Sequence, residues 1–307
     1  MHNRVLRLLI FVLLLTVVIL LNQSTVWAQS SIERNVPATP DDVIFETEIA
    51  YREGHPRWVL NVIQPNQKST DPRPAVLLVH GGGWAMGDQY KFTRMGFMIA
   101  RQGYVVILPT YRLYRDAPFP ACLEDLKNAI RWVRANAKKY NIDPNRIGAY
   151  GNSAGGTQVL TAALTNGMKS LEGDGPYQEF SSDLQAVVCS GAVGDMLHPT
   201  HGKRAVFAYR NMATGGDRSV SDTEVKKVLR QASPSTYIRK DAPPLLVIHG
   251  AKDDVVVVDS TDEFVQAMKK VEADITYMRY EAGTHIVMGQ YQKETTPAML
   301  KFFKKNL

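Results

Sequence analysis

Residues 151–155, Gly-Asn-Ser-Ala-Gly, have the types and spacing of a segment that can present a nucleophilic hydroxyl. A short apolar run ends in this segment and a helix-forming run follows it, so the chain is predicted to turn sharply at Ser153. Glycine on either side lets the backbone turn tightly and keeps the hydroxyl clear of the preceding strand. The five-residue pattern is short enough to arise by chance, so the prediction depends on what the rest of the chain supplies.

Residues 80–84, His-Gly-Gly-Gly-Trp, form a second candidate segment, directly after the apolar run 75–79. Glycine has no Cβ, so backbone N–H groups in this loop can approach a negatively charged oxygen closely. We predict an oxyanion hole in which Gly82 and Gly83 act together with the N–H of Ala154. The alternative is a glycine-rich turn for tight packing or phosphate binding. The chain has neither the Gly-Lys-Ser/Thr of a P-loop nor a Gly-x-Gly-x-x-Gly fingerprint.

A serine hydroxyl needs a general base, and His285 is the predicted one. His285 follows the last predicted strand and comes after both Ser153 and an acidic loop, which matches the order serine, acid, histidine. His249 ends a strand and is predicted to be a packed or loop-orienting residue. His2 is assigned to the leader, and His55 and His80 are assigned to early loops. His198 and His201 could line a pocket but are expected to be solvated.

The catalytic acid is expected in residues 249–254, His-Gly-Ala-Lys-Asp-Asp, after the predicted strand 244–248. Two adjacent carboxylates compete there, and we predict Asp253, with Asp254 as the alternative. The acid would hold the imidazole of His285 in the right tautomer and stabilise its protonated form. Of the remaining candidates, Asp259 is predicted to cap the following helix and Asp195 to be a turn residue.

Alternation of strands and helices predicts the frame that must position these residues, an α/β fold with a mostly parallel sheet. The first two strands are read as an antiparallel pair. Strands are expected at residues 43–50, 58–63, 75–79, 104–108, 147–150, 186–190, 244–248 and 275–280. Helices are expected at residues 120–140, 154–166, 259–271 and 291–305.

Residues 191–233 interrupt this alternation. They mix Gly, His, Asp and Arg and have only short periodic pieces. We predict a small irregular insertion over the site. Together with Trp84, which we expect to contact substrate, this insertion should shape the pocket.

The 307-residue chain carries a formal net charge of +6, with its Lys and Arg residues scattered apart from a group near the C-terminus. A nucleic-acid-binding protein more often shows a basic stripe with interleaved aromatic residues, so no nucleic-acid partner is expected. One domain is predicted at residues 43–307, after a polar, flexible lead-in at 29–42. Cys122 and Cys189, the only cysteines, are predicted to be buried, either as free thiols or as a disulfide.

Residues 1–28 are predicted to be a signal peptide. Arg4 and Arg7 precede an unbroken apolar run at 8–21, and small residues at Val26 and Ala28 suggest cleavage before Gln29. The protein is therefore expected to be exported, periplasmic or secreted, with no stable membrane association after cleavage. The alternative is an uncleaved anchor, although the apolar run is shorter than the roughly 20 residues that span a bilayer.

Several segments together resemble the hormone-sensitive-lipase-like and feruloyl-esterase-like (BD-FAE-type) carboxylesterases. They lie in register over residues 43–307 and comprise residues 80–84, 119–132, 143–147 (Asp-Pro-Asn-Arg-Ile), 151–156, 232–234 (Ala-Ser-Pro) and the His-Gly-x-x-Asp of 249–253. The resemblance implies an α/β-hydrolase fold with helices on both faces of the sheet and a serine mechanism without metal or cofactor. It maps the family's acid onto Asp253.

The same resemblance implies small-molecule or polysaccharide-borne ester substrates with short or aromatic acyl groups, acetyl or feruloyl groups among them. Three positions depart from the family pattern and leave the substrate open: Asn152, Val257 and residues 286–287. Catalysis through an acyl-enzyme should weaken toward acid pH as the catalytic histidine takes up a proton. A serine peptidase, a long-chain lipase and a catalytically silent binding protein are the alternatives.

Overall fold

The structure is a computed structural model that describes residues 36–307. The predicted signal peptide at residues 1–28 and the first part of the predicted lead-in lie outside the described residues. The lead-in residues that are described, 36–42, contain no helix or strand, and the first strand begins at Val43, as predicted. None of the helices in the described part of the chain is long and apolar enough to cross a membrane.

Eight strands form one sheet in the order β1-β2-β4-β3-β5-β6-β7-β8. The β1–β2 and β2–β4 pairs are antiparallel, and every other pair is parallel. The strands are β1 (Val43–Ala50), β2 (Val59–Pro65), β3 (Arg73–Val79), β4 (Val105–Pro109), β5 (Ile142–Asn152), β6 (Ala186–Ser190), β7 (Leu245–Gly250) and β8 (Ile275–Tyr280). The predicted fold class and the predicted antiparallel pair are therefore confirmed.

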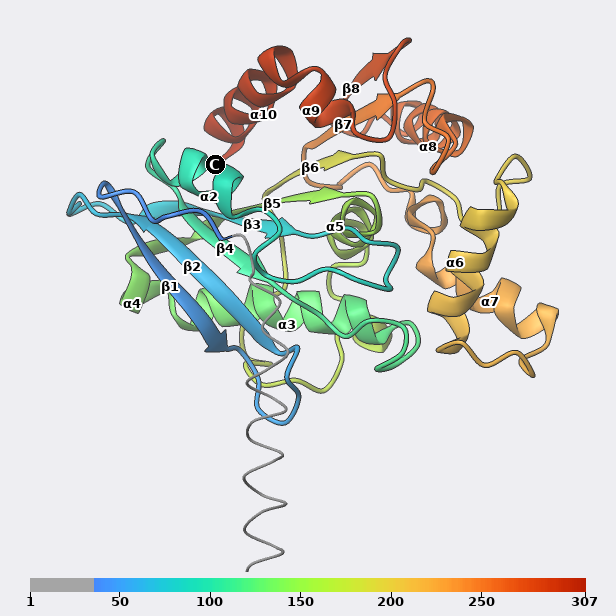
Figure 1. Cartoon of the computed structure of the whole chain (residues 1–307), viewed down its shortest axis with the longest axis horizontal. Helices are drawn as coiled ribbons and strands as arrows, with labels where there is room; N and C mark the ends of the chain where they lie inside the picture. The colour runs from blue at the N-terminus through green and yellow to red at the C-terminus, as the bar shows by residue number, and fades with distance from the viewer. Residues whose placement is uncertain (1–35) are drawn as a thin grey trace, which may run out of the picture. The chain divides into compact units, whose positions relative to one another are not determined.

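Helices cover both faces of this sheet (Figure 1). The α-helices are α2 (Thr93–Ala100), α3 (Ala121–Ala135), α4 (Ala137–Tyr140), α5 (Ala154–Leu164), α6 (Lys203–Thr214), α7 (Asp222–Ala232), α8 (Val258–Lys270), α9 (Val287–Gln290) and α10 (Gln292–Asn306). Two short 3₁₀ helices are η1 (Lys169–Leu171) and η2 (Pro234–Tyr237).

The strand β3 shows why the sheet is buried on both sides. Successive side chains of a strand point to opposite faces. Ala75, Leu77 and Val79 contribute to a core with α3, α5 and α8, whereas Val76 and Leu78 contribute to a second core with α2, α9 and α10. A continuous apolar run is thus what this position of the sheet requires.

The insertion between β6 and β7 differs from the prediction, because residues 191–233 contain the helices α6 and α7 instead of an irregular segment. Each helix buries only a narrow stripe of side chains, such as Val225, Leu229 and Ala232 of α7. In α6 the exposed Val206 and Phe207 lie beside the buried stripe and blur the helical period, whereas the period of α7 is clear in the sequence. The hydroxyl of Ser221 caps α7 by accepting the N–H of Glu224 at 3.2 Å.

Other local predictions also needed correction. The helix expected at residues 120–140 ends at Ala135 and resumes as the short α4, and α2 was not predicted. Asp259 lies within the first turn of α8 and does not cap it, since the N-cap position is Val257. Cys122 and Cys189 are both buried and free, so the thiol interpretation holds and the disulfide does not.

Candidate active site

Ser153 occupies the sharp turn between β5 and α5 with φ +54° and ψ −124°, a conformation that side chains rarely adopt. Its backbone N–H donates to the carbonyl of Ser190 at 2.8 Å, which fixes the turn against β6. A Cβ on Gly151 would lie 2.3 Å from the carbonyl oxygen of Gly155, and a Cβ on Gly155 would lie 2.2 Å from that of Val79. Both flanking glycines are therefore required by close backbone contacts.

The glycine loop after β3 lies against this turn. A Cβ on Gly81 would come within 3.1 Å of the Ser153 Cβ, and one on Gly82 would lie 2.1 Å from the Met86 carbonyl oxygen. Gly82 and Gly83 have φ +114° and +59°, and within residues 36–307 neither donates its N–H to another residue. With Ala154 they line the same cleft as Ser153, so the predicted oxyanion donors and the predicted nucleophile share one site.

His285 lies beyond the carboxyl end of β8, and its Nδ1 is 2.8 Å from Oδ2 of Asp253, beyond the end of β7. The structure thus brings Asp253 to the histidine and leaves the neighbouring Asp254 exposed. Oδ1 of Asp253 accepts the backbone N–H groups of Val255 and Val256 at 2.9 and 2.8 Å. Every acceptor oxygen of this buried carboxylate is therefore held by a donor.

Opposing effects act on the pKa of the Asp253 carboxyl. Burial raises this pKa, but the hydrogen bonds from His249 and His285 and the charge of His285 outweigh burial and hold it well below its usual range. Asp253 is consequently ionised throughout the neutral and mildly acidic range. An ionised carboxylate on Nδ1 favours the His285 tautomer that leaves Nε2 free to accept a proton.

His249 contacts the same carboxylate oxygen. Its Nε2 lies 3.1 Å from Oδ2 of Asp253 and 3.0 Å from the carbonyl oxygen of Val256, and the side chain is completely buried. Both neighbours are acceptors, so Nε2 carries the proton and donates it. The sequence interpretation of His249 as a packed or loop-orienting residue did not include this contact with the predicted acid.

Ser153 and His285 both line the cleft, but no hydrogen bond joins their side chains in the described structure. Catalytic hydrogen bonds are often long without substrate and tighten when substrate binds. The arrangement can therefore supply a hydroxyl nucleophile, an oriented imidazole and backbone donors within one cleft.

The remaining histidines lie elsewhere. His80 is buried, its ring stacks on Tyr111 at 4.3 Å, and its Nδ1 lies 2.8 Å from the carbonyl oxygen of Gly81. The expectation that His198 and His201 are solvated is wrong, since the His198 side chain is 7% exposed and pairs with Glu263, and His201 is buried. Packing of α6 accounts for the burial of His201, because the ring of His201 contacts that of Tyr209 at 5.1 Å.

The fold and this arrangement can be compared with known proteins. The sequence profile of the BD-FAE family matches residues 60–268, about two thirds of the chain. The chain belongs to the BD-FAE family. It is 29% identical over 240 residues to the esterase LipC of Mycobacterium tuberculosis (strain ATCC 25618 / H37Rv), a match that covers 75% of this chain and 57% of LipC. This BD-FAE chain spans about half the length of the curated relatives it matches.

Solved structures resemble this BD-FAE chain over most of its length. A truncated carbohydrate esterase from gut microbiota superposes with a TM-score of 0.80 and 26% identity, covering 89% of this chain and 99% of that one. An acetyl ester-xyloside bifunctional hydrolase from Caldicellulosiruptor lactoaceticus superposes with a TM-score of 0.67 and 25% identity, covering 80% and 88%. These matches establish the α/β-hydrolase fold.

The cleft of this BD-FAE chain measures about 520 Å³, within the usual range for small-molecule sites. Most of its wall is formed by the glycine loop, the turn at Ser153 and α6. Several lining residues were not predicted: Met86, Lys91, Arg204, Ala205, Ala208, Tyr209 and Val255. Four of them belong to α6, in the segment predicted to be irregular. The buried stripe through Ala205, Tyr209 and Met212 is the sequence signal that indicates this helix.

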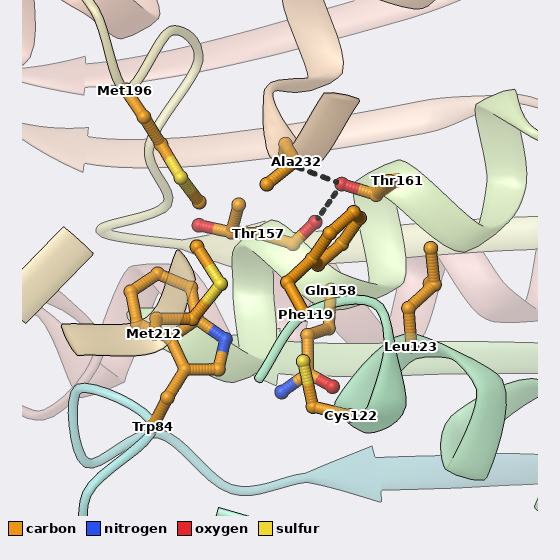
Figure 2. Close-up of a pocket in the computed structure, with 10 residues that line it drawn as sticks. All are labelled: Trp84, Phe119, Cys122, Leu123, Thr157, Gln158, Thr161, Met196, Met212 and Ala232. Atoms are coloured by element: carbon orange, nitrogen blue, oxygen red, sulfur yellow. Dashed lines mark hydrogen bonds between the residues drawn. The ribbon is translucent and has the colours of Figure 1, made fainter. Parts of the chain in front are cut away.

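Trp84 lines this cleft and also a much smaller cavity of about 10 Å³ (Figure 2). Trp84 is 3% exposed, and its ring lies edge-on to that of Tyr209 at 6.1 Å. The ring extends among the other side chains around the small cavity, such as Phe119 and Met212. The small cavity holds one water molecule at most. Trp84, predicted to contact substrate, thus forms a wall of the cleft with almost no free space behind it.

Among the described residues, no group of three or more His, Cys, Asp or Glu side chains is arranged to hold a metal ion. The histidines and carboxylates of this BD-FAE site contact one another as donors and acceptors, as Asp253 does with His249 and His285.

Proposed function

We propose that the protein is a serine carboxylic ester hydrolase that removes short acyl groups, acetyl foremost, from carbohydrate. One observation carries this proposal: the Asp253–His285 pair, joined at 2.8 Å, borders the same cleft as Ser153 and the glycine loop. Names of similar proteins support the chemistry, since LipC is an esterase and the superposed structures include a carbohydrate esterase and an acetyl ester-xyloside hydrolase.

The proposed reaction begins when Nε2 of His285 takes the proton of the Ser153 hydroxyl, which attacks the ester carbonyl carbon. The carbonyl oxygen becomes negatively charged and accepts hydrogen bonds from the N–H groups of Gly82, Gly83 and Ala154. His285 then gives its proton to the departing alcohol and leaves an acyl-enzyme. Water, deprotonated by His285, attacks the acyl-enzyme, releases the carboxylic acid and restores Ser153.

The walls of the cleft favour a short acyl group. Trp84 is almost completely buried, and the cavity behind it has too little room for an acyl chain. Tyr209 packs edge-on against the indole and stabilises its position. A longer or aromatic acyl group such as feruloyl would have to lie toward the open side of the cleft, so acetyl fits this arrangement better.

The test is hydrolysis of p-nitrophenyl esters of increasing acyl length, together with acetylated xylan and methyl ferulate. We expect the highest kcat/KM with acetyl and a fall as the chain lengthens. Ser153→Ala is the control and should lose nearly all activity, because the residual rate of triad variants comes from binding and the oxyanion donors alone. Equal turnover by Ser153→Ala and wild type would overturn the serine mechanism and leave the binding-protein alternative standing. Cleavage of a peptide amide by wild type, lost in Ser153→Ala, would instead support the peptidase alternative.

Export remains part of this proposal. An apolar run at 8–21 after two arginines, followed by small residues at Val26 and Ala28, supports a cleaved signal. N-terminal sequencing of the protein from its native host, separated into periplasmic, secreted and membrane fractions, tests it. A chain that begins at Gln29 outside the membrane fraction is expected, and an intact N-terminus in the membrane fraction would show an anchor.

A further inference from the structure

The charged side chains that line the cleft are both cations, Lys91 and Arg204, and no Asp or Glu side chain lines it. Neither cation lies within ion-pair distance of a carboxylate in residues 36–307, although many other Lys and Arg residues of the described chain do, Arg52 and Arg57 among them. A cleft lined by one sign of charge concentrates ligands of the opposite sign.

The two cations come from separate elements. Lys91 lies between the glycine loop and α2 in the chain, and Arg204 lies in the first turn of α6. This first turn contains no acidic residue. Two acidic residues near the lining residues have other partners: Oδ1 of Asp88 accepts the N–H of Tyr90, and the carboxylate of Asp253 accepts hydrogen bonds from His249, His285 and two backbone N–H groups. Nothing in the described cleft wall neutralises the pair.

Two exposed hydrophobic side chains form an apolar rim of the same cleft. Met86, on the glycine loop, is 66% exposed, and Val255, two residues after Asp253, is 40% exposed. Ile286, next to His285 in the chain, is a further exposed hydrophobic residue at 71%. Exposed apolar groups gathered at an opening mark a surface that contacts a ligand or partner.

Cations and apolar side chains together match one chemical class within carbohydrate esters. A sugar ring offers a C–H face to an aliphatic rim, whereas a neutral sugar offers Lys91 and Arg204 only uncharged hydroxyl acceptors. A uronic acid unit offers both a ring and a carboxylate, which pairs with ammonium and guanidinium groups.

We propose that Lys91 and Arg204 bind a carboxylate of the substrate, so that the ester removed by Ser153 belongs to an anionic, uronate-bearing glycan. This inference rests on the proposed carbohydrate esterase function and specifies its substrate class. Both cations are exposed, so each ion pair contributes modestly and weakens with added salt.

The experiment compares acetylated xylo-oligosaccharides with and without a uronic acid branch, at equal acetyl content, by release of acetate. Wild type is expected to favour the uronate-bearing substrate in kcat/KM by about three- to tenfold, the range that two exposed ion pairs supply. High salt should reduce this ratio toward one. The double variant Lys91→Gln/Arg204→Gln should bring the ratio near one at low salt.

The matched control is Arg94→Gln/Lys203→Gln. These residues are exposed neighbours of the two cations that do not line the cleft, so the control removes the same net charge. The control should keep the wild-type ratio. If the kcat/KM ratio stays at the wild-type value in Lys91→Gln/Arg204→Gln, or falls equally in the control, the two lining cations do not bind the substrate carboxylate.

The remaining outcomes separate this inference from the function on which it rests. Equal release of acetate from both oligosaccharides by wild type overturns the uronate preference alone. Release from neither overturns the carbohydrate esterase function and the preference with it. If Lys91→Gln/Arg204→Gln abolishes sedimentation with phosphatidylglycerol-containing vesicles but leaves the substrate ratio unchanged, the rim docks on an anionic lipid surface and the glycan proposal is wrong.

Discussion

His249 and His285 donate N–H groups to the same carboxylate oxygen, Oδ2 of Asp253, at 3.1 and 2.8 Å. His285 belongs to the predicted triad, whereas His249 is buried behind it on the last residues of β7. The hydrogen bond from His249 fixes the orientation of the carboxylate. It also competes with His285 for the negative charge on Oδ2. His249 is therefore expected to act as a positioning residue through Asp253.

Replacement of His249 tests this relationship. His249→Phe keeps a flat ring but removes the donor, and we expect kcat to fall about tenfold, the effect of losing one hydrogen bond to a charged group. Asp253 would also stabilise a protonated His285 more strongly, so the acid limb of the kcat/KM profile should move to higher pH. His249→Gln retains an N–H donor and should restore both. If His249 had a purely structural role, its replacement would lower the yield of folded protein and leave the acid limb of the kcat/KM profile at its wild-type pH.

Substitution of the two adjacent carboxylates distinguishes Asp253 from Asp254. Asp253→Asn should lower kcat by about a thousandfold or more, because the amide no longer favours the reactive tautomer of His285. Asp254→Asn changes an exposed side chain one residue along and should keep kcat near the wild-type value. Steady-state turnover of p-nitrophenyl acetate measures both, and a larger loss in Asp254→Asn would reverse the assignment.

The sheet was predictable because its strands are buried on both faces. Every residue of β6 is buried, and so are the last five of β3, so the sequence contains apolar runs that no amphipathic surface element would have. Chain order then placed Ser153, Asp253 and His285 beyond the carboxyl ends of three parallel strands, β5, β7 and β8, and these ends lie along one edge of the sheet.

The pocket wall was less predictable because it depends on tertiary packing. The stripe of α6 through Ala205 and Tyr209 is short and encloses the exposed apolar residues Val206 and Phe207, so the sequence showed no single apolar face. Lys91 and Arg204 have no motif of their own, and only the folded chain shows that both line one cleft without an acidic partner. The contact of His249 with Asp253 likewise depends on how the loop after β7 folds back.

His80 should make stability depend on pH. Burial lowers its pKa from 6.5 to about 4, so between these values the unfolded chain binds a proton that the folded chain does not. The free energy of unfolding should therefore decrease as pH falls from about 6.5 to about 4, by at most roughly 3 kcal/mol from this residue.

Urea denaturation of wild type and His80→Asn over this pH range measures the His80 contribution. Asn retains a side-chain N–H that can reach the carbonyl of Gly81, and the variant should show a flatter dependence on pH. Parallel curves for wild type and His80→Asn would mean that His80 takes up its proton equally in the folded and unfolded chains.

Glu172 holds a pair of buried cations remote from the cleft, and its removal should destabilise the fold. Its carboxylate lies 2.6 Å from Nζ of Lys127 and 2.7 Å from the guanidinium of Arg131, whose side chains are 0% and 2% exposed. Burial lowers the pKa of both cations and Glu172 opposes this effect, so Glu172→Gln leaves two buried charges uncompensated. We expect a loss of about 3 kcal/mol or more in urea denaturation. Glu179→Gln, an exposed neighbour without an ion pair in the described structure, should change little, and equal stability of the two variants would mean that the buried cations do not need Glu172.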